Sequence, residues 1–133
     1  MREGLRVLVA EDEAMTGLAI HAVLSAHHCD VLLASGIEHA LQVADPLDIV
    51  DLAIVDLKLA DGSGTSLIEH LRALRPELSV IVSTGYALDD VDLQVLGTGA
   101  GRMVVLEKPW SEAELISAIG AATQPSVSVV VTG

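Results

Sequence analysis

Short apolar runs alternate with longer segments of helical periodicity along most of the chain. The runs are rich in leucine and β-branched residues, which is typical of strands buried on both faces of a sheet. We expect five strands, over residues 5–10, 31–34, 52–56, 79–83 and 103–106. Helices are predicted over about 14–27, 37–44, 67–74 and 88–96, and from Ser111 onward. Glu114 follows Ser111 by three residues, which predicts a capping box on the last helix.

The first predicted helix shows the helical spacing in its apolar residues, which are Met15, Leu18, Ala19, Ala22 and Val23. Five strand–helix units in about 120 residues predict one parallel sheet with helices on both faces, a doubly wound α/β domain. The crossovers should be right-handed. We expect one domain over residues 1–123. The valine-rich, uncharged tail over 124–133 is compatible with an edge strand, a partner-binding strand or a frayed end.

Composition and charge narrow the class of protein. Hydrophobic residues make up 51% of the chain, which excludes a disordered protein, and the aromatic content of 2% predicts a core of aliphatic side chains. The net charge of -12 would repel DNA and anionic membranes, so neither is expected as a direct partner. Cys29 is the single cysteine, and we find no signal peptide and no apolar run that could span a membrane. We therefore expect a cytoplasmic protein.

Polar side chains follow four of the five predicted strands. They are Glu11, Asp12 and Glu13 after the first strand, Asp56 after the third, Thr84 after the fourth and Lys108 after the fifth. Ligands of open parallel sheets bind beyond the carboxyl ends of the strands, so Asp12 and Asp56 converge if the first and third strands are neighbours. Crowded carboxylates call for a cation, and oxygen ligands suit Mg2+. A lysine and a threonine facing that ion could bind phosphoryl oxygens, so the set is suited to phosphoryl transfer.

These motifs resemble the receiver domain of two-component response regulators. The match lies in the acidic pair within VLVAEDE, in Asp56 within AIVDLKLADGSG, in Thr84 within VIVSTGY and in Lys108-Pro109 within EKPW. The resemblance covers roughly residues 5 to 122, and four motifs in the right order, each at the end of a predicted strand, make it specific. It implies a flavodoxin-like (βα)5 fold with strand order 2-1-3-4-5, in the chemotaxis-regulator-like superfamily.

The resemblance also implies a metal and a phosphoryl donor. Asp56 is expected to be the phosphoacceptor, which takes the group from a phosphohistidine on a sensor histidine kinase or a phosphotransfer protein. Mg2+ is the implied cofactor, with Asp12 and Asp56 as ligands and Glu11 acting through water. The main-chain carbonyl of Lys58 would be a further metal ligand.

Three further expectations follow from the resemblance. Thr84 would bond the phosphoryl group and report its arrival. Lys108 would pair with a phosphoryl oxygen. The Lys108–Pro109 peptide bond is expected to be cis, as such bonds need a proline.

Two features depart from the family pattern. Val105 stands three residues before Lys108, where relatives often have Tyr or Phe. In those relatives the aromatic side chain acts as a switch that swings inward with the threonine, and the resemblance does not extend to such a switch here. Lys58 and Tyr86 are unusual in bulk and charge where they flank Asp56 and Thr84. We hypothesise that these two side chains shield the acyl phosphate from water and slow its loss.

The expected output is a protein contact. The last predicted helix ends about ten residues before the end of the sequence, so we expect a stand-alone, single-domain regulator, as a monomer or weak dimer. It would not be an enzyme beyond its own phosphotransfer and autodephosphorylation. The acidic residues Asp89, Asp90 and Asp92 form a solvated helix face or a partner surface. A phosphate sink or shuttle is an alternative role.

Other interpretations compete with the phosphoacceptor. A receiver fold could act as a binding module without phosphorylation, although such a module need not keep the matching residues. An aspartyl-phosphate hydrolase of the haloacid dehalogenase type typically needs a second aspartate where Lys58 stands. His27-His28-Cys29 is interpreted as a helix end with a buried thiol rather than a metal site, because adjacent residues seldom share one metal. Asp61-Gly62-Ser63-Gly64 lacks the lysine of a phosphate loop and is interpreted as a turn and helix start.

Overall fold

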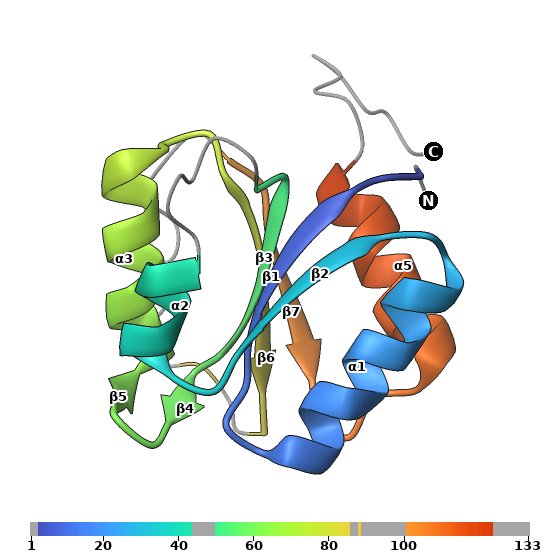
Figure 1. Cartoon of the computed structure of the whole chain (residues 1–133), viewed down its shortest axis with the longest axis horizontal. Helices are drawn as coiled ribbons and strands as arrows, with labels where there is room; N and C mark the ends of the chain where they lie inside the picture. Colours follow the sequence, from blue (N-terminus) through green and yellow to red (C-terminus); the bar gives the residue numbers. More distant parts are fainter. Residues whose placement is uncertain (1–2, 44–49, 86–87, 89–100, 124–133) are drawn as a thin grey trace.

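The computed structural model describes residues 3–43, 50–85, 88 and 101–123. Within these ranges the chain forms a five-stranded sheet, a short hairpin and four helices (Figure 1). The sheet strands are β1 (Arg6–Ala10), β2 (Asp30–Ala34), β3 (Leu52–Asp56), β6 (Ser79–Thr84) and β7 (Met103–Glu107). The hairpin consists of β4 (Lys58–Leu59) and β5 (Gly62–Ser63). The helices are α1 (Ala14–Ala26), α2 (Ile37–Val43), α3 (Gly64–Leu74) and α5 (Glu112–Thr123).

The sheet is parallel throughout, with the order β2-β1-β3-β6-β7. Because β4 and β5 pair only with each other, the five sheet strands follow the predicted order 2-1-3-4-5. The order places β1 and β3 side by side, which confirms the condition on which convergence of Asp12 and Asp56 depended. Asp56 itself lies opposite Ser83 in the register of β3 and β6.

Helices cover both faces of the sheet, so the predicted doubly wound architecture is confirmed (Figure 1). Helices α2 and α3 lie on one face, and α1 and α5 lie on the other. Each face has its own apolar cluster, built almost wholly from aliphatic side chains. Strand β3 is buried along its whole length, which fits its unbroken apolar sequence. Asp56 ends this strand and is therefore held by a rigid central element.

Of the residues that set the helical spacing of α1, only Val23 is partly buried, and the others are exposed. Met15 and Leu18 are 76% and 60% exposed, and the buried positions are Gly17, Ile20 and Leu24. The helix is apolar on several sides, so its sequence periodicity could not indicate which side faces the sheet. An apolar surface is therefore left uncovered on α1, next to the carboxyl end of β1.

The other helices follow their sequence signals closely. Helix α3 buries Leu67, Ile68 and Leu71 and ends at Leu74, before Pro76, as predicted. At α5 the capping box is confirmed in both directions. The Glu114 N–H donates to Ser111 Oγ and the Ser111 N–H to Glu114 Oε1, both at 3.1 Å.

The two histidines after α1 belong to a helix end, as the sequence indicated. His27 is the C-cap, and its backbone N–H donates to the carbonyls of the last turn. His28 has a φ of 62°, in the left-handed region that ends a helix. Cys29 is buried, and burial raises the pKa of its thiol. These contacts support the interpretation as a structural turn.

Some expectations fall on residues outside the described ranges. These are the helix predicted over 88–96 apart from Leu88, the side chain of Tyr86 and the tail over 124–133. None of the helices within the described ranges is long and apolar enough to cross a membrane.

The loop after Asp56, predicted to be a turn followed by a helix start, forms a two-stranded hairpin that leads into α3. Its strands β4 and β5 pair Lys58 with Ser63, and Ser63 Oγ then caps α3 by accepting the Thr65 N–H at 3.2 Å. Gly62 has a φ of 147°, which a side chain would strain. The following Gly64 has no room for a Cβ, which would lie 2.1 Å from the Asp56 carbonyl oxygen. The two glycines thus let α3 begin directly against Asp56.

Asp61, at the tip of this hairpin, ties it to α2. Its carboxylate accepts the backbone N–H groups of Ile37 at 2.9 Å and Glu38 at 3.2 Å. This side chain therefore caps a helix that lies far from it in the sequence. The contact restrains the loop that follows Asp56.

Asp61→Ala should lower the thermal unfolding midpoint by a few degrees at pH 7. The hydrogen bonds to the two N–H groups lower the pKa of Asp61 from 3.8, so its contribution to stability is present above pH 3.8. This contribution is lost as the pH falls through the lower pKa of the folded state. Circular dichroism melts from pH 7 to pH 2 should therefore show the difference from wild type shrinking below pH 3.8. Asp30→Ala, at another exposed acid, is the control, and an equal effect of both changes would contradict the cap.

Candidate functional site

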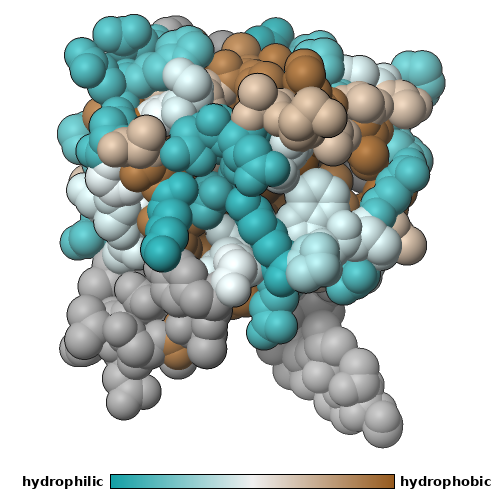
Figure 2. Space-filling model, turned by 90° about the horizontal axis from the view of Figure 1, so that it is seen from below, coloured by the Kyte–Doolittle hydropathy of each residue, from teal (hydrophilic) through white to brown (hydrophobic). Residues whose placement is uncertain are grey.

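Polar residues lie at or just after the carboxyl ends of four strands of the sheet. Glu11 follows β1, Asp56 ends β3, Thr84 ends β6 and Lys108 follows β7. The strands are parallel, so these residues lie at the same end of the sheet. Figure 2 shows polar side chains gathered across the middle of this end of the molecule, with apolar ones beside them.

Three carboxylates form the centre of the site. Glu11, Asp12 and Asp56 each offer an oxygen, and these oxygens lie within 4.8 Å of one another. Glu11 and Asp56 are buried, whereas Asp12 is exposed, so the cluster is open to solvent on one side. The acidic pair and Asp56 therefore converge as the sequence predicted. Glu13 is the N-cap residue of α1 and accepts a hydrogen bond from the Thr16 hydroxyl.

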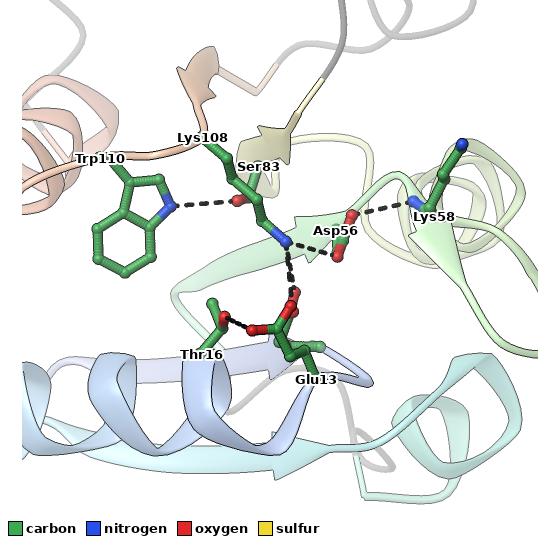
Figure 3. Close-up of polar contacts among 8 residues, drawn as sticks. Glu13, Thr16, Asp56, Lys58, Ser83, Lys108 and Trp110 are labelled. Carbon is green, nitrogen blue, oxygen red and sulfur yellow. Dashed lines mark hydrogen bonds and ion pairs between the residues drawn. The ribbon is translucent and has the colours of Figure 1, made fainter.

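Lys108 places one positive charge among these acids. Its ammonium nitrogen Nζ lies 2.9 Å from Asp56 Oδ2 and 3.3 Å from Glu11 Oε1. Figure 3 shows its side chain reaching from the segment after β7 toward Asp56. The cis peptide bond expected between Lys108 and Pro109 is present. Three carboxylates against one ammonium leave the site with an excess of negative charge.

The environment of the site shifts the pKa values of Glu11, Asp56 and Lys108. Burial raises the pKa of Glu11 from 4.5 to about 7, and Asp56 adds to the rise. Burial alone would raise the pKa of Asp56 too, but hydrogen bonds from Glu11, Lys108 and the Lys58 backbone lower it below 3.8. Burial would lower the pKa of Lys108, yet Asp56 and Glu11 raise it above 10.5. Asp56 and Lys108 are therefore ionised at neutral pH, while Glu11 titrates there.

The hairpin after β3 supplies a second contact to Asp56. The Lys58 backbone N–H donates to Asp56 Oδ1 at 3.0 Å, and the Lys58 side chain is exposed. Asp56 thus has one oxygen facing Lys58 and the other facing Lys108 (Figure 3). The hypothesis that Lys58 and Tyr86 shield this group stays a prediction, because Tyr86 lies outside the described residues.

Thr84 and Val105 occupy the positions that the sequence assigned to them. Thr84 is the last residue of β6 and is buried, and its carbonyl accepts the Lys108 N–H at 2.7 Å. Val105 lies on β7 and is 40% exposed. The place where an aromatic side chain is common in the resembled family is therefore on an accessible part of the sheet.

Two polar contacts near the site could not be predicted from the sequence. Asp61 holds the hairpin, and Ser83 Oγ accepts the indole N–H of Trp110 at 3.3 Å. Both contacts join segments that are distant in sequence, and a serine in an apolar run has no local pattern that names its partner. Trp110 therefore makes a polar contact beside the site in addition to its apolar packing.

A groove of about 540 Å³ lies beside the charged cluster. It runs between the first turns of α1 and the segment from Lys108 to Trp110, with Met15 and Ala19 along its α1 side. The α1 side of the groove thus combines apolar Met15 and Ala19 with polar Glu13 and Thr16, and Lys108 connects the groove to Asp56.

The chain is a doubly wound α/β domain with an acidic cluster and a lysine at the carboxyl ends of its parallel strands. The family model of the response regulator receiver domain matches residues 7–120. This chain therefore belongs to the response regulator receiver domain family. It is a receiver domain of two-component signalling, as the resemblance implied.

Individual relatives agree with this assignment. Cell cycle response regulators CtrA of Brucella ovis and Brucella abortus are 28% identical over 133 residues. The matched region is 97% of this chain but 56% of those proteins, so the chain spans about half the length of these curated relatives.

Two solved structures share the fold. A CheY-like receiver domain protein from Methanospirillum hungatei JF-1 has a TM-score of 0.77 at 27% identity, over 90% of this chain and 93% of that one. The receiver domain of sensor histidine kinase PA1611 from Pseudomonas aeruginosa PAO1 has a TM-score of 0.76 at 26% identity, over 90% of this chain and 97% of that one. That structure has a magnesium ion coordinated in its active-site cleft.

The raised pKa of Glu11 predicts a pH dependence of stability in metal-free buffer. The folded protein keeps a proton on Glu11 that the unfolded chain releases above pH 4.5, so stability falls as the pH rises from 4.5 to about 7. Glu11→Gln should remove this slope and raise the melting temperature by several degrees at pH 8, with little change at pH 4.5.

Calorimetric melts with a chelator present would measure this effect. Glu13→Gln changes an exposed acid two residues along the chain and should keep the wild-type slope. An unchanged slope in Glu11→Gln would contradict the assigned pKa.

Proposed function

We propose that this chain is a phosphoacceptor switch. Asp56 receives a phosphoryl group from a phosphohistidine of a sensor histidine kinase or phosphotransfer protein, and the signal passes on through protein contacts. The observation that carries the proposal is the placement of Lys108 Nζ 2.9 Å from Asp56 Oδ2, within an acidic cluster. A single aspartate paired with a lysine and flanked by two further acids is suited to phosphoryl transfer.

Mg2+ fits the donor set of this cluster. Carboxylate oxygens are hard ligands, and three of them lie close enough to share one ion. Asp12 and Asp56 would hold the ion, with Glu11 through water and the Lys58 carbonyl as a further ligand. When bound, Mg2+ supplies positive charge that attracts the phosphoryl oxygens and offsets the carboxylates.

The transfer makes one bond and breaks one. A carboxylate oxygen of Asp56 attacks phosphorus and forms the P–O bond, while the P–N bond to the donor imidazole breaks. The leaving nitrogen keeps the electron pair of the P–N bond, and a proton on the other ring nitrogen lets the ring leave as neutral imidazole. Asp56 is ionised for this attack because its pKa lies below 3.8. Lys108 then pairs with a phosphoryl oxygen, and Thr84 donates its hydroxyl to another.

The donor approaches across α1. Met15 and Leu18 are exposed on this helix, and Met15 and Ala19 line the groove beside Lys108. A partner that covers this surface buries apolar area and brings its phosphohistidine to Asp56. Such a partner is a protein rather than a nucleic acid, in keeping with the net charge of -12.

The chain acts on itself rather than on an external substrate. Its chemistry consists of phosphotransfer onto Asp56 and later hydrolysis of the acyl phosphate. A binding module that works without phosphorylation is the alternative. The contacts among Asp56, Lys108 and Glu11 argue against that alternative, because a purely structural module has no need of a buried acidic cluster.

Intact-mass spectrometry after incubation with acetyl phosphate and Mg2+ tests the proposal. Wild type should gain one phosphoryl group, which should disappear with a chelator and in Asp56→Asn. Asp30→Asn makes the same chemical change at an exposed acid of β2 and should leave the adduct intact. If rapidly sampled wild type gains no phosphoryl group, the unphosphorylated module becomes the better explanation.

A further inference from the structure

The segment that carries Lys108 is fastened to the end of β6 at two neighbouring residues. The Lys108 N–H donates to the Thr84 carbonyl at 2.7 Å, and the Trp110 indole N–H donates to Ser83 Oγ at 3.3 Å. Figure 3 shows the Trp110 ring directed toward Ser83 on one side of Lys108. The backbone N–H of Lys108 and the side chain of Trp110 are thus both bonded to the end of the same strand.

Ser83 also contacts the strand that carries the phosphoacceptor. It lies opposite Asp56 in the register of β3 and β6, and its carbonyl accepts the Leu57 N–H at 3.2 Å. Only 1% of Ser83 is exposed. Three parts of the site therefore meet at one buried serine: the end of β3, the end of β6 and the lysine segment.

The indole ring has a defined place in this arrangement. It packs against the apolar cluster between the sheet and the helices α1 and α5, and it lines the groove beside Lys108. An indole has a single N–H donor, and a buried hydroxyl needs a partner. The bond between them satisfies both groups and selects one orientation of the ring.

We infer that Trp110 and Ser83 form a positioning pair that holds Lys108 against Asp56. This inference rests on the proposed function, because the position of Lys108 matters most when a phosphoryl group arrives. Lysine has a flexible side chain, so the direction in which its ammonium points depends on a fixed backbone. Neither Trp110 nor Ser83 touches the reacting atoms, so their effect passes through Lys108.

Loss of the indole–hydroxyl bond frees the segment without removing any charge from the site. Ser83→Ala removes the acceptor, and Trp110→Phe removes the donor while it keeps an aromatic ring. A displacement of 1 Å in a reacting group can cost about 100-fold in rate. We expect each change to slow phosphorylation of Asp56 by acetyl phosphate about tenfold at saturating donor.

The double variant separates a positioning pair from two independent packing losses. If the two residues act through one bond, Ser83→Ala with Trp110→Phe should be no slower than either single variant. Multiplied effects would overturn the inference. Ser79→Ala is the matched control, because it removes a hydroxyl from the opposite end of the same strand. It should leave the rate unchanged.

Acylation of lysines gives a second measurement that needs neither donor nor Mg2+. The chain has two lysines, and the exposed Lys58 serves as an internal standard for Lys108. Ser83→Ala and Trp110→Phe should each raise the labelling rate of Lys108 relative to Lys58 severalfold, as read by peptide mass spectrometry. An unchanged ratio in both variants would overturn the inference.

The two measurements also distinguish this inference from the proposed function. If wild type takes no phosphoryl group but the labelling ratio rises in the variants, the pair positions Lys108 and the proposed function fails. If wild type is phosphorylated and neither the rate nor the ratio changes, the proposed function stands and the pair has no positioning role.

Discussion

The ion pair between Lys108 and Asp56 is the contact on which the organisation of this domain depends. It joins the segment after β7 to the end of β3, across the intervening strand β6. Glu11 and Asp12 add two further carboxylates from the end of β1. A single ammonium cannot balance three carboxylates. Burial, with Asp56 beside it, raises the pKa of Glu11 to about 7. The site is thus built to receive positive charge, and this requirement links its geometry to a divalent cation and a phosphoryl group.

Rigid elements on both sides of the site hold its charged groups in place. Strand β3 is buried along its length and cannot shift without disturbing both apolar layers. The loop after it is restrained by the cap from Asp61 to α2 and by the close approach of Gly64 to the Asp56 carbonyl. On the other side, Thr84 and Ser83 hold the Lys108 segment. These rigid elements keep the three carboxylates close together although their negative charges repel one another.

The apolar pattern predicted the five strands, the resemblance to receiver domains implied their order, and that order brings the acidic pair beside Asp56. These predictions succeeded because buried parallel strands have a plain pattern and because parallel strands bring their carboxyl ends to one edge. The buried side of α1 was not predictable, since Met15 and Leu18 are as apolar as the residues that it buries. The roles of Asp61 and Ser83 could not be predicted either. Their partners depend on how loops are placed in space, and a lone polar residue carries no signal of a distant partner.

Binding of beryllofluoride, a mimic of the phosphoryl group, would test most directly whether this charge arrangement serves phosphoryl transfer. Fluorine NMR of the wild-type protein should show a bound species only when Mg2+ is present, and Asp56→Asn should abolish it. A bound signal of equal strength in the presence of a chelator, or no bound signal with Mg2+, would contradict a metal-assisted phosphoacceptor at Asp56.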